Sequence, residues 1–302
     1  MNLTRGNPLL PELVLLLAVF IWGATFTVVK QALEFTSPFM FMTLRFAIAL
    51  AIISVASAPR LGAITRRELL GGAITGVALF AGFAFQTWGL VYTSASKSAF
   101  ITGLNVVLVP IMLFGFNRRP IAGKRWAAVG LATLGLLLLT DPTSAAGLNR
   151  GDVLTVGCAA AFAGQIIFLS IYAPTVNTLR YFWVQLITVT TLAAAATLAV
   201  GGWRVTPTAT LWWSLGITGV LGTALAFLAQ TWAQRRTSPT RTALILTMEP
   251  VVGALFAVVV AGETLPATAW LGGIIVVAAI VWSELGVSGR EALRTRGATP
   301  EP

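Results

Sequence analysis

Long apolar stretches alternate with short polar connections along almost the whole chain. Ten of these stretches are close to the roughly 20 residues that an α-helix needs to cross the hydrocarbon core of a membrane. The connections are rich in Pro, Gly, Ser, Thr and Arg, and none is long enough to form a soluble domain. The pattern predicts an all-α integral membrane protein with ten transmembrane helices, at residues 10–29, 38–57, 69–92, 98–116, 122–140, 152–173, 181–200, 210–232, 242–261 and 267–285.

Composition narrows the function classes open to such a chain. Only 10% of the 302 residues are charged and 57% are hydrophobic, whereas an ordinary globular domain carries about 25% charged residues. The sequence holds no histidine and a single cysteine, Cys158. It therefore offers no His-based catalytic triad, no His metal site and no intrachain disulfide. We expect no catalytic residues, no bound metal and no cofactor, and we do not expect an enzyme.

The basic residues indicate how the helices are oriented. Ten spans place both ends of the chain on one side of the membrane, and that side carries 15 Lys and Arg residues against four on the other. The richer side holds Arg5, Arg60, Arg66, Arg67, Arg118, Arg119, Lys124, Arg125, Arg180, Arg235, Arg236, Arg241, Arg290, Arg294 and Arg296, and the poorer side Lys30, Lys97, Arg150 and Arg204. The positive-inside rule then predicts cytoplasmic termini in a multi-pass protein of the cell inner membrane. We interpret the net charge of +10 as this topology signal and expect no nucleic-acid partner.

The two halves of the chain repeat one another at an offset of 143 or 144 residues. Ile74-Thr75-Gly76-Val77 recurs as Ile217-Thr218-Gly219-Val220, Gln86-Thr87-Trp88 as Gln230-Thr231-Trp232, Thr93-Ser94 as Thr237-Ser238, and Trp126 as Trp270. Pro110 and Pro250 are 140 residues apart, one helical turn out of step. The alternative explanation is chance similarity between helices rich in Ala, Gly and Leu.

The number of spans fixes the relation between the two halves. Each half holds five spans, and an odd number makes the second copy cross the membrane in the opposite sense. Such an inverted repeat is typical of secondary transporters, in which two similar halves open a central site to each side in turn. We expect one five-helix repeat at residues 1–147, a second at residues 148–287 and a cytoplasmic tail at residues 288–302.

Several short motifs, taken in their order, resemble the drug/metabolite transporter superfamily, specifically its EamA type. They are Trp22-Gly23-Ala24-Thr25-Phe26, Lys30, Ser37-Pro38, Arg45-Phe46, Glu249-Pro250, Gly262-Glu263 and Gly272-Gly273. The first-half counterpart of Gly262-Glu263 is missing, because Asn117-Arg118-Arg119 stands there. The resemblance implies ten helices in two EamA-like repeats and transport of small organic metabolites, often as export. One branch of the superfamily, the YddG-like exporters, moves aromatic and other amino acids.

Glu249 is the strongest single candidate for a binding residue. It lies about ten residues into the ninth span, and it is the one carboxylate at such depth in the predicted helices. Ionised groups there cost about 2.5–3.5 kcal/mol on insertion scales. It either binds a substrate ammonium group or a proton, or it forms a structural pair with a basic residue such as Arg45. A third interpretation is that its carboxyl caps the backbone freed by Pro250.

Other side chains near mid-depth are candidates for a substrate-binding site. Neutral polar groups either line a cavity or hydrogen-bond between helices, and aromatic rings either form its walls or face lipid. Arg45 is a structural residue or holds a substrate carboxylate. With Glu249, the predicted substrate-binding set is Trp22, Thr25, Phe83, Gln86, Asn105, Phe162, Gln165, Phe227 and Gln230.

Together these features favour a secondary transporter that works by alternating access. The resemblance implies that it exports amino acids, aromatic or other, or related amphipathic solutes. No G-x-x-x-x-G-K-[ST] motif for ATP occurs. One alternative is a proton-coupled drug/metabolite antiporter of the same fold. The others are a membrane-embedded enzyme and a scaffold, the last of which predicts no cavity between the halves. The expected partners are a small-molecule substrate and the lipid bilayer, with the chain as a monomer or homodimer.

Overall fold

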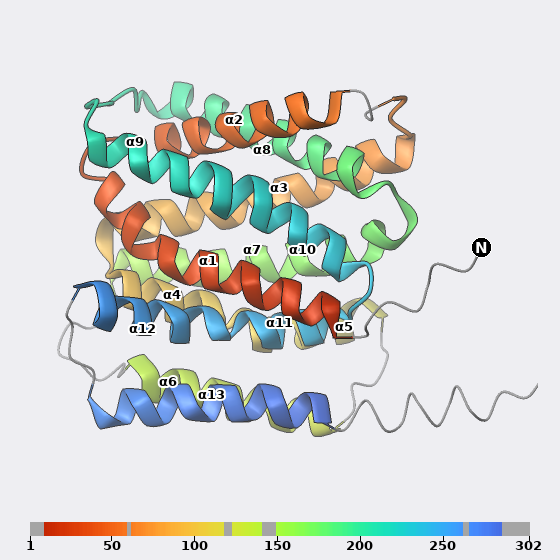
Figure 1. Cartoon of the computed structure of the whole chain (residues 1–302), viewed down its shortest axis with the longest axis vertical. Helices are drawn as coiled ribbons and strands as arrows, with labels where there is room; N and C mark the ends of the chain where they lie inside the picture. Colours follow the sequence, from red (N-terminus) through yellow and green to blue (C-terminus); the bar gives the residue numbers. More distant parts are fainter. Residues whose placement is uncertain (1–8, 59–61, 118–122, 141–148, 262–265, 286–302) are drawn as a thin grey trace, which may run out of the picture.

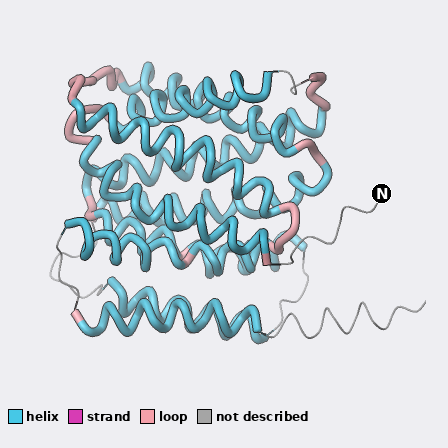
Figure 2. The backbone as a smooth tube through the Cα atoms, in the orientation of Figure 1, coloured by secondary structure: helices cyan, strands magenta, loops and turns pink. Residues whose placement is uncertain are grey.

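The computed structural model of the chain describes residues 9–58, 62–117, 123–140, 149–261 and 266–285. Within these residues the chain is helical almost throughout, and the loops gather at the two ends of the bundle (Figure 2). In chain order the helices are α1 (Leu10–Ala32), α2 (Pro38–Ser57), α3 (Arg66–Tyr92), α4 (Ala95–Gly103), α5 (Asn105–Asn117), α6 (Gly123–Thr140), α7 (Arg150–Tyr172), η2 (Ala173–Thr175), α8 (Thr178–Val200), α9 (Ala209–Gly216), η3 (Ile217–Leu225), α10 (Ala226–Gln234), α11 (Pro239–Leu246), α12 (Met248–Ala261) and α13 (Ala267–Leu285).

All ten predicted spans correspond to helices, but three of them are composite. The fourth span consists of α4 and α5, the eighth of α9, η3 and α10, and the ninth of α11 and α12. By length and composition, seven helical segments of the described residues are able to cross a membrane, and α6 and α13 contain shorter apolar helices. The Gly262-Glu263 motif, Arg118-Arg119 and the expected tail at 288–302 lie outside the described residues.

Side-chain caps start the helices at equivalent points of the two halves. The Ser94 hydroxyl caps α4 and the Ser238 hydroxyl caps α11, each accepting the backbone N–H three residues later. Thr65 and Thr208 do the same for α3 and α9. Such caps satisfy N–H groups that the first turn of a helix leaves without partners. The capping residues are 144 and 143 residues apart, so the repeat in the sequence is also a repeat in structure.

Packing between the halves follows the same register. Gly76 of α3 lies against the carbonyl oxygen of Gln185 in α8, and Gly219 of η3 lies against that of Arg45 in α2. A Cβ atom added at either glycine would be 3.2 Å from that oxygen. The glycines are 143 residues apart and their partners are 140 apart, so one contact repeats the other. We call residues related in this way, by 140 in α1 and α2 and by 143 or 144 from α3 onwards, repeat mates.

Helices of the two halves are interleaved rather than separated. α3 packs along α7 and α8, and α1 packs along α10 and α12. The mates α6 and α13 pack on each other in a layer at one edge of the bundle (Figure 1). The start of α1 and the end of α13 lie at the same end of the bundle (Figure 1), which we name the terminal face. The other end is the opposite face.

The outer surface of the bundle is apolar. Val55, Trp213 and Val259 are 79, 73 and 81% exposed, and they come from three different helices. Large exposed apolar side chains of this kind are unfavourable in water and favourable in hydrocarbon. Together with the apolar helices of membrane-spanning length, they describe a multi-pass membrane protein.

Candidate functional site

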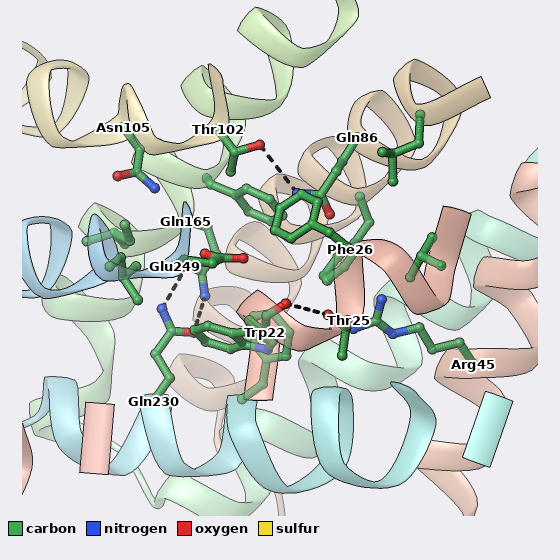
Figure 3. A pocket seen from close by; sticks show the side chains of 17 residues that line it. Trp22, Thr25, Phe26, Arg45, Gln86, Thr102, Asn105, Gln165, Gln230 and Glu249 are labelled. Atoms are coloured by element: carbon green, nitrogen blue, oxygen red, sulfur yellow. Dashed lines mark hydrogen bonds between the residues drawn. The ribbon is translucent and has the colours of Figure 1, made fainter. Parts of the chain in front are cut away.

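A cavity of about 50 Å³ lies in the middle of the bundle, between the two halves. All ten side chains predicted from the sequence line it: Trp22, Thr25, Phe83, Gln86, Asn105, Phe162, Gln165, Phe227, Gln230 and Glu249. The lining is completed by Phe26, Val29, Arg45, Leu90, Thr102, Ile166 and Leu246 (Figure 3). The structure therefore gathers the predicted residues in one place, and their binding of a substrate stays a prediction.

Most of this lining consists of repeat mates. The mate pairs are Trp22 and Phe162, Thr25 and Gln165, Phe26 and Ile166, Phe83 and Phe227, Gln86 and Gln230, Thr102 and Leu246, and Asn105 and Glu249. Equivalent residues from both halves meet only near the axis that relates the halves. The cavity therefore lies on this approximate axis, where inverted-repeat transporters place their sites.

Aromatic rings form one wall of the cavity. The Phe83 ring lies 5.4 Å from that of Phe162 and 5.6 Å from that of Phe227, between ring centres. The Trp22 ring lies 4.7 Å from that of Phe227. Tilted and edge-on contacts at these distances are favourable for aromatic pairs. The four rings give the cavity a continuous apolar wall that suits an amphipathic molecule.

Two of the lining spans are interrupted beside the cavity. Leu104 separates α4 from α5, and Thr247 separates α11 from α12. The two breaks are one residue apart in the repeat register, since the mate of Leu104 is Met248. Their φ and ψ angles are nevertheless alike, −62° and −9° for Leu104 and −66° and −11° for Thr247. The ring of Pro250 crowds the carbonyl four residues earlier and favours the second break, whereas Pro110 lies inside α5. The backbone geometry at the two breaks is therefore the same whether or not a proline follows closely.

The breaks present polar side chains to the cavity. Asn105 follows the first break directly, and its Oδ1 atom is buried without a hydrogen-bond partner among the described residues. Its mate Glu249 follows the second break by two residues and takes part in none of the ion pairs between described residues. Both groups are therefore available to a ligand, as are polar groups at interrupted transporter helices.

Amide side chains cross the cavity with long hydrogen bonds. Gln165 and Gln230 exchange two bonds of 3.4 Å, and Gln86 donates to the Thr102 hydroxyl at 3.4 Å. Good N–H···O bonds measure 2.7–3.2 Å. These side chains can therefore exchange their present bonds for bonds to a ligand at little cost.

A π-helix in the second half has no counterpart in the first. η3 spans Ile217–Leu225, whereas the equivalent part of α3 is an ordinary α-helix. The offset between mates rises from 143 at Gly219 to 144 at Phe227, so this segment holds one extra residue. A one-residue insertion in an α-helix is accommodated as a π-turn, frequently at functional sites.

The π-helix positions Arg45. The Gly222 carbonyl accepts a hydrogen bond from Trp22 Nε1 at 2.8 Å and from Arg45 Nη2 at 3.4 Å. The Thr223 hydroxyl accepts from Arg45 Nε at 2.7 Å. The guanidinium also stacks on Phe83, 4.5 Å from the ring centre, a favourable cation–π contact. Arg45 lines the cavity, and its Nη1 atom donates no hydrogen bond to any described residue.

Arg45 and Glu249 lie on different sides of the cavity. Figure 3 shows Arg45 entering from α2 and Glu249 from α12, with Trp22 and Thr25 between them in this view. No salt bridge joins the two side chains, both of which are described. A direct Arg45–Glu249 pair, one of the interpretations open from the sequence, is therefore not what the structure shows. The cavity instead has a cationic side and an acidic side.

Some lining residues were not in the predicted set. Phe26, Ile166, Thr102 and Leu246 are two mate pairs one position or one turn from predicted residues, and the repeat register was a signal that could have found them. Arg45, which the sequence left open as a structural residue or a carboxylate-binding one, also lines the cavity. No group of three His, Cys, Asp or Glu side chains among the described residues could hold a metal ion.

Comparison with known proteins identifies this architecture. The EamA-like transporter family matches the chain twice, at residues 9–141 and 149–284. The chain belongs to the EamA-like transporter family. A solved crystal structure with 17% sequence identity shares the fold, with a TM-score of 0.76 over 93% of this chain and 98% of that chain.

Several EamA-like relatives are similar over most of their length. An uncharacterized transporter of Archaeoglobus fulgidus is 33% identical over 91% of this chain and 86% of its own. The uncharacterized inner membrane transporter YedA of Escherichia coli is 25% identical over 93% of both chains. A protein of the same bacterium named "Probable amino-acid metabolite efflux pump" is 28% identical over 92% of this chain and 96% of its own. The family has a ten-helix, two-repeat fold, so this chain is a multi-pass membrane transporter.

Proposed function

We propose that this EamA-like protein is a secondary transporter that exports amino acids or related amphipathic solutes by alternating access. The observation that carries the proposal is the cavity on the repeat axis, with Arg45 and Glu249 on different sides of it. An amino acid carries a carboxylate and an ammonium group on one small molecule. Arg45 is suited to the carboxylate, and Glu249 with Asn105 to the ammonium group.

The rest of the cavity fits the same class of solute. The wall of Trp22, Phe83, Phe162 and Phe227 offers an apolar surface for a side chain. The exchangeable amides of Gln86, Gln165 and Gln230 offer further hydrogen bonds. The relative named as an amino-acid metabolite efflux pump supports export of such solutes.

The charge distribution supports a location and an orientation. In the sequence, 15 Lys and Arg residues fall in the connections expected on the side of the termini and four in those on the other side. The positive-inside rule assigns the richer side to the cytoplasm. The relative YedA is named as an inner membrane transporter. We therefore place the protein in the inner membrane with both termini in the cytoplasm.

Flux from proteoliposomes tests the proposal. Vesicles holding the purified protein are loaded with one radiolabelled solute each: an aromatic amino acid, a small amino acid, a monoamine, a monocarboxylate or a neutral sugar. We expect the amino acids to leave faster than from protein-free vesicles, and faster than the singly charged solutes. Efflux of no solute above the protein-free rate contradicts transport. Efflux of singly charged solutes alone contradicts the assignment to amino acids.

A second candidate is a proton-coupled antiporter of the same fold. The observation that favours it is Glu249, the one carboxylate among the described residues lining the cavity. An inward proton gradient should then accelerate efflux in the wild type. The Glu249→Gln variant should transport at one rate with and without the gradient. A wild type that ignores the gradient contradicts coupling and leaves facilitated export.

A further inference from the structure

An ion pair joins the two halves at the opposite face. Lys97, at the start of α4, lies 3.2 Å from Asp152 Oδ2, at the start of α7. The other carboxylate oxygen, Oδ1, accepts a hydrogen bond of 2.6 Å from the Thr93 hydroxyl. Asp152 also accepts the backbone N–H of Asn149 in a capping box. Both oxygens of this carboxylate are therefore satisfied.

The repeat mates of these residues form a second ion pair at the terminal face. Arg241, at the start of α11, is the mate of Lys97, and its Nη1 atom lies 3.0 Å from Glu12 Oε1. Glu12, at the start of α1, is the mate of Asp152. Each pair joins a helix of one half to a helix of the other, at one end of the bundle. We name them the opposite-face latch (Lys97–Asp152) and the terminal-face latch (Arg241–Glu12).

The two latches are not equally complete. Thr237 is the mate of Thr93, but its hydroxyl is buried without a hydrogen-bond partner among the described residues. Glu12 Oε2 is likewise buried without one. The bond from the threonine to the second carboxylate oxygen is therefore made at the opposite face and missing at the terminal face. Buried polar atoms without partners are costly, so the terminal-face latch lacks a stabilising bond that the opposite-face latch makes, although its ion pair is the shorter, at 3.0 Å against 3.2 Å.

The latches lie at the two ends of a path through the cavity. Eight residues separate Lys97 from Asn105 and Arg241 from Glu249, which is about 12 Å of helix in each case. Between them lie the mates Ser98 and Thr242, one turn before the cavity-lining residues Thr102 and Leu246 and on the same helix faces. Both hydroxyls are fully buried and lack partners among the described residues. Unsatisfied hydroxyls in line with the cavity mark the route that water and solute take when an end opens.

From these observations we infer that the two latches are the gates of alternating access: breaking the Arg241–Glu12 latch opens the cavity to the terminal face, and breaking the Lys97–Asp152 latch opens it to the opposite face. The inference rests on the proposed function, because a gate has a role only in a protein that transports a solute. The positions of the two ion pairs do not depend on that function. The structure is a state in which both latches are made.

A third ion pair of the structure supplies a control. Arg180 lies 2.9 Å from Glu68 and also joins the two halves at the terminal face. The mate of Arg180 is Met40 and that of Glu68 is Leu211, so this pair has no counterpart at the other end. It links α3 to α8, and no residue of α8 lines the cavity. It is therefore a structural pair rather than a gate.

Thiol labelling tests the latches without a known substrate. In a Cys158→Ser background, Ser98→Cys reports on the path to the opposite face and Thr242→Cys on the path to the terminal face. Each reporter is labelled in vesicles with a membrane-impermeant maleimide applied from either side. We combine them with Lys97→Gln and Arg241→Gln, which leave both carboxylates in place. Arg180→Gln is the control, and Lys97→Arg and Arg241→Lys are the conservative variants.

The expected result is a reciprocal shift. Lys97→Gln should raise labelling of the Ser98→Cys reporter from the opposite face severalfold and lower labelling of the Thr242→Cys reporter. Arg241→Gln should do the reverse, and the conservative variants should restore the original pattern. A change of both reporters in the same direction, no change, or an equal effect of Arg180→Gln would overturn the inference. Absence of any transported solute with a reciprocal shift present would count against the proposed function and leave the gates standing.

Discussion

Asn105 and Glu249 occupy equivalent positions in the two halves, and both side chains enter the same cavity just after a break in their helices. The first half thus contributes a neutral amide where the second contributes a carboxylate. Arg45 has a similar relation to its mate Gln185, which does not line the cavity. An almost symmetric scaffold therefore encloses an asymmetric site, and this asymmetry gives a bound solute one preferred orientation.

The first prediction concerns Glu249. Glu249→Gln makes its position resemble that of Asn105 and removes the acidic side of the cavity. Since hydrogen bonds to charged groups contribute about 1.5–3 kcal/mol, the apparent affinity for amino acids should fall about tenfold or more. Competition between labelled and unlabelled solute in proteoliposomes measures this. Retained wild-type affinity would show that Glu249 does not contact the ammonium group.

The second prediction concerns Arg45. Arg45→Gln should weaken transport of solutes with a carboxylate by about tenfold or more, while monoamines should be affected far less. Arg45→Lys keeps the charge but loses the planar fork that bonds Gly222 and Thr223, so it should recover only part of the activity. Comparing flux of an amino acid with that of its decarboxylated amine separates the two cases. Equal losses for both solutes would indicate a structural role instead.

The third prediction concerns the extra residue of the π-helix. Deleting Leu221 should convert η3 into an α-helix, as in the equivalent part of α3, and remove the Gly222 carbonyl from Trp22 and Arg45. Helix content by circular dichroism should stay the same, while carboxylate-dependent flux should fall as far as in Arg45→Gln.

A matched deletion controls for the loss of a residue. Deleting Phe80 takes a residue from an uninterrupted part of α3 and rotates the remainder by about 100°. This protein should fail to accumulate in the membrane. Equal carboxylate-dependent flux in the Leu221 deletion and the wild type would contradict a positioning role for η3.

The fourth prediction concerns the packing of α1 on α12. A Cβ atom at Gly23 would lie 2.8 Å from Val252 Cβ and 2.9 Å from the Glu249 carbonyl oxygen. Gly23→Ala should therefore force α1 away from α12, at a cost of about 1–3 kcal/mol, and lower both the thermal stability in detergent and the flux. Gly130→Ala is the control, because a Cβ there meets nothing within 4 Å. Equal melting temperatures for both variants would contradict the close contact.

Periodicity and charge were sufficient to predict the ten spans, because a membrane helix must be apolar over its whole length. The same reasoning predicted ten of the residues that line the cavity, because polar and aromatic residues near mid-depth of different spans converge where the spans pack. Phe83 and Phe227, for example, are mates that meet at one wall. Whether those residues bind a solute is a separate question that the flux experiments address.

Local backbone geometry was not predictable in the same way. The breaks at Leu104 and Thr247 leave hydropathy unchanged, so no apolar pattern reports them. The rise of the repeat offset from 143 to 144 was visible in the sequence, but the sequence did not show that the Gly222 carbonyl of the resulting π-helix would accept hydrogen bonds from Trp22 and Arg45. The latches consist of charged residues at the ends of spans. Charged side chains are common there, and the sequence alone does not show which of them pair.

Countertransport tests the central claim most directly, since it requires a site that faces each side in turn. Vesicles containing the protein are preloaded with an unlabelled amino acid, and uptake of the same labelled amino acid is followed from outside. The account predicts faster uptake and a transient overshoot relative to empty vesicles, because loaded sites return quickly to the outer side. Uptake that is independent of the internal solute would indicate an open pore or no transport, and would contradict alternating access through this cavity.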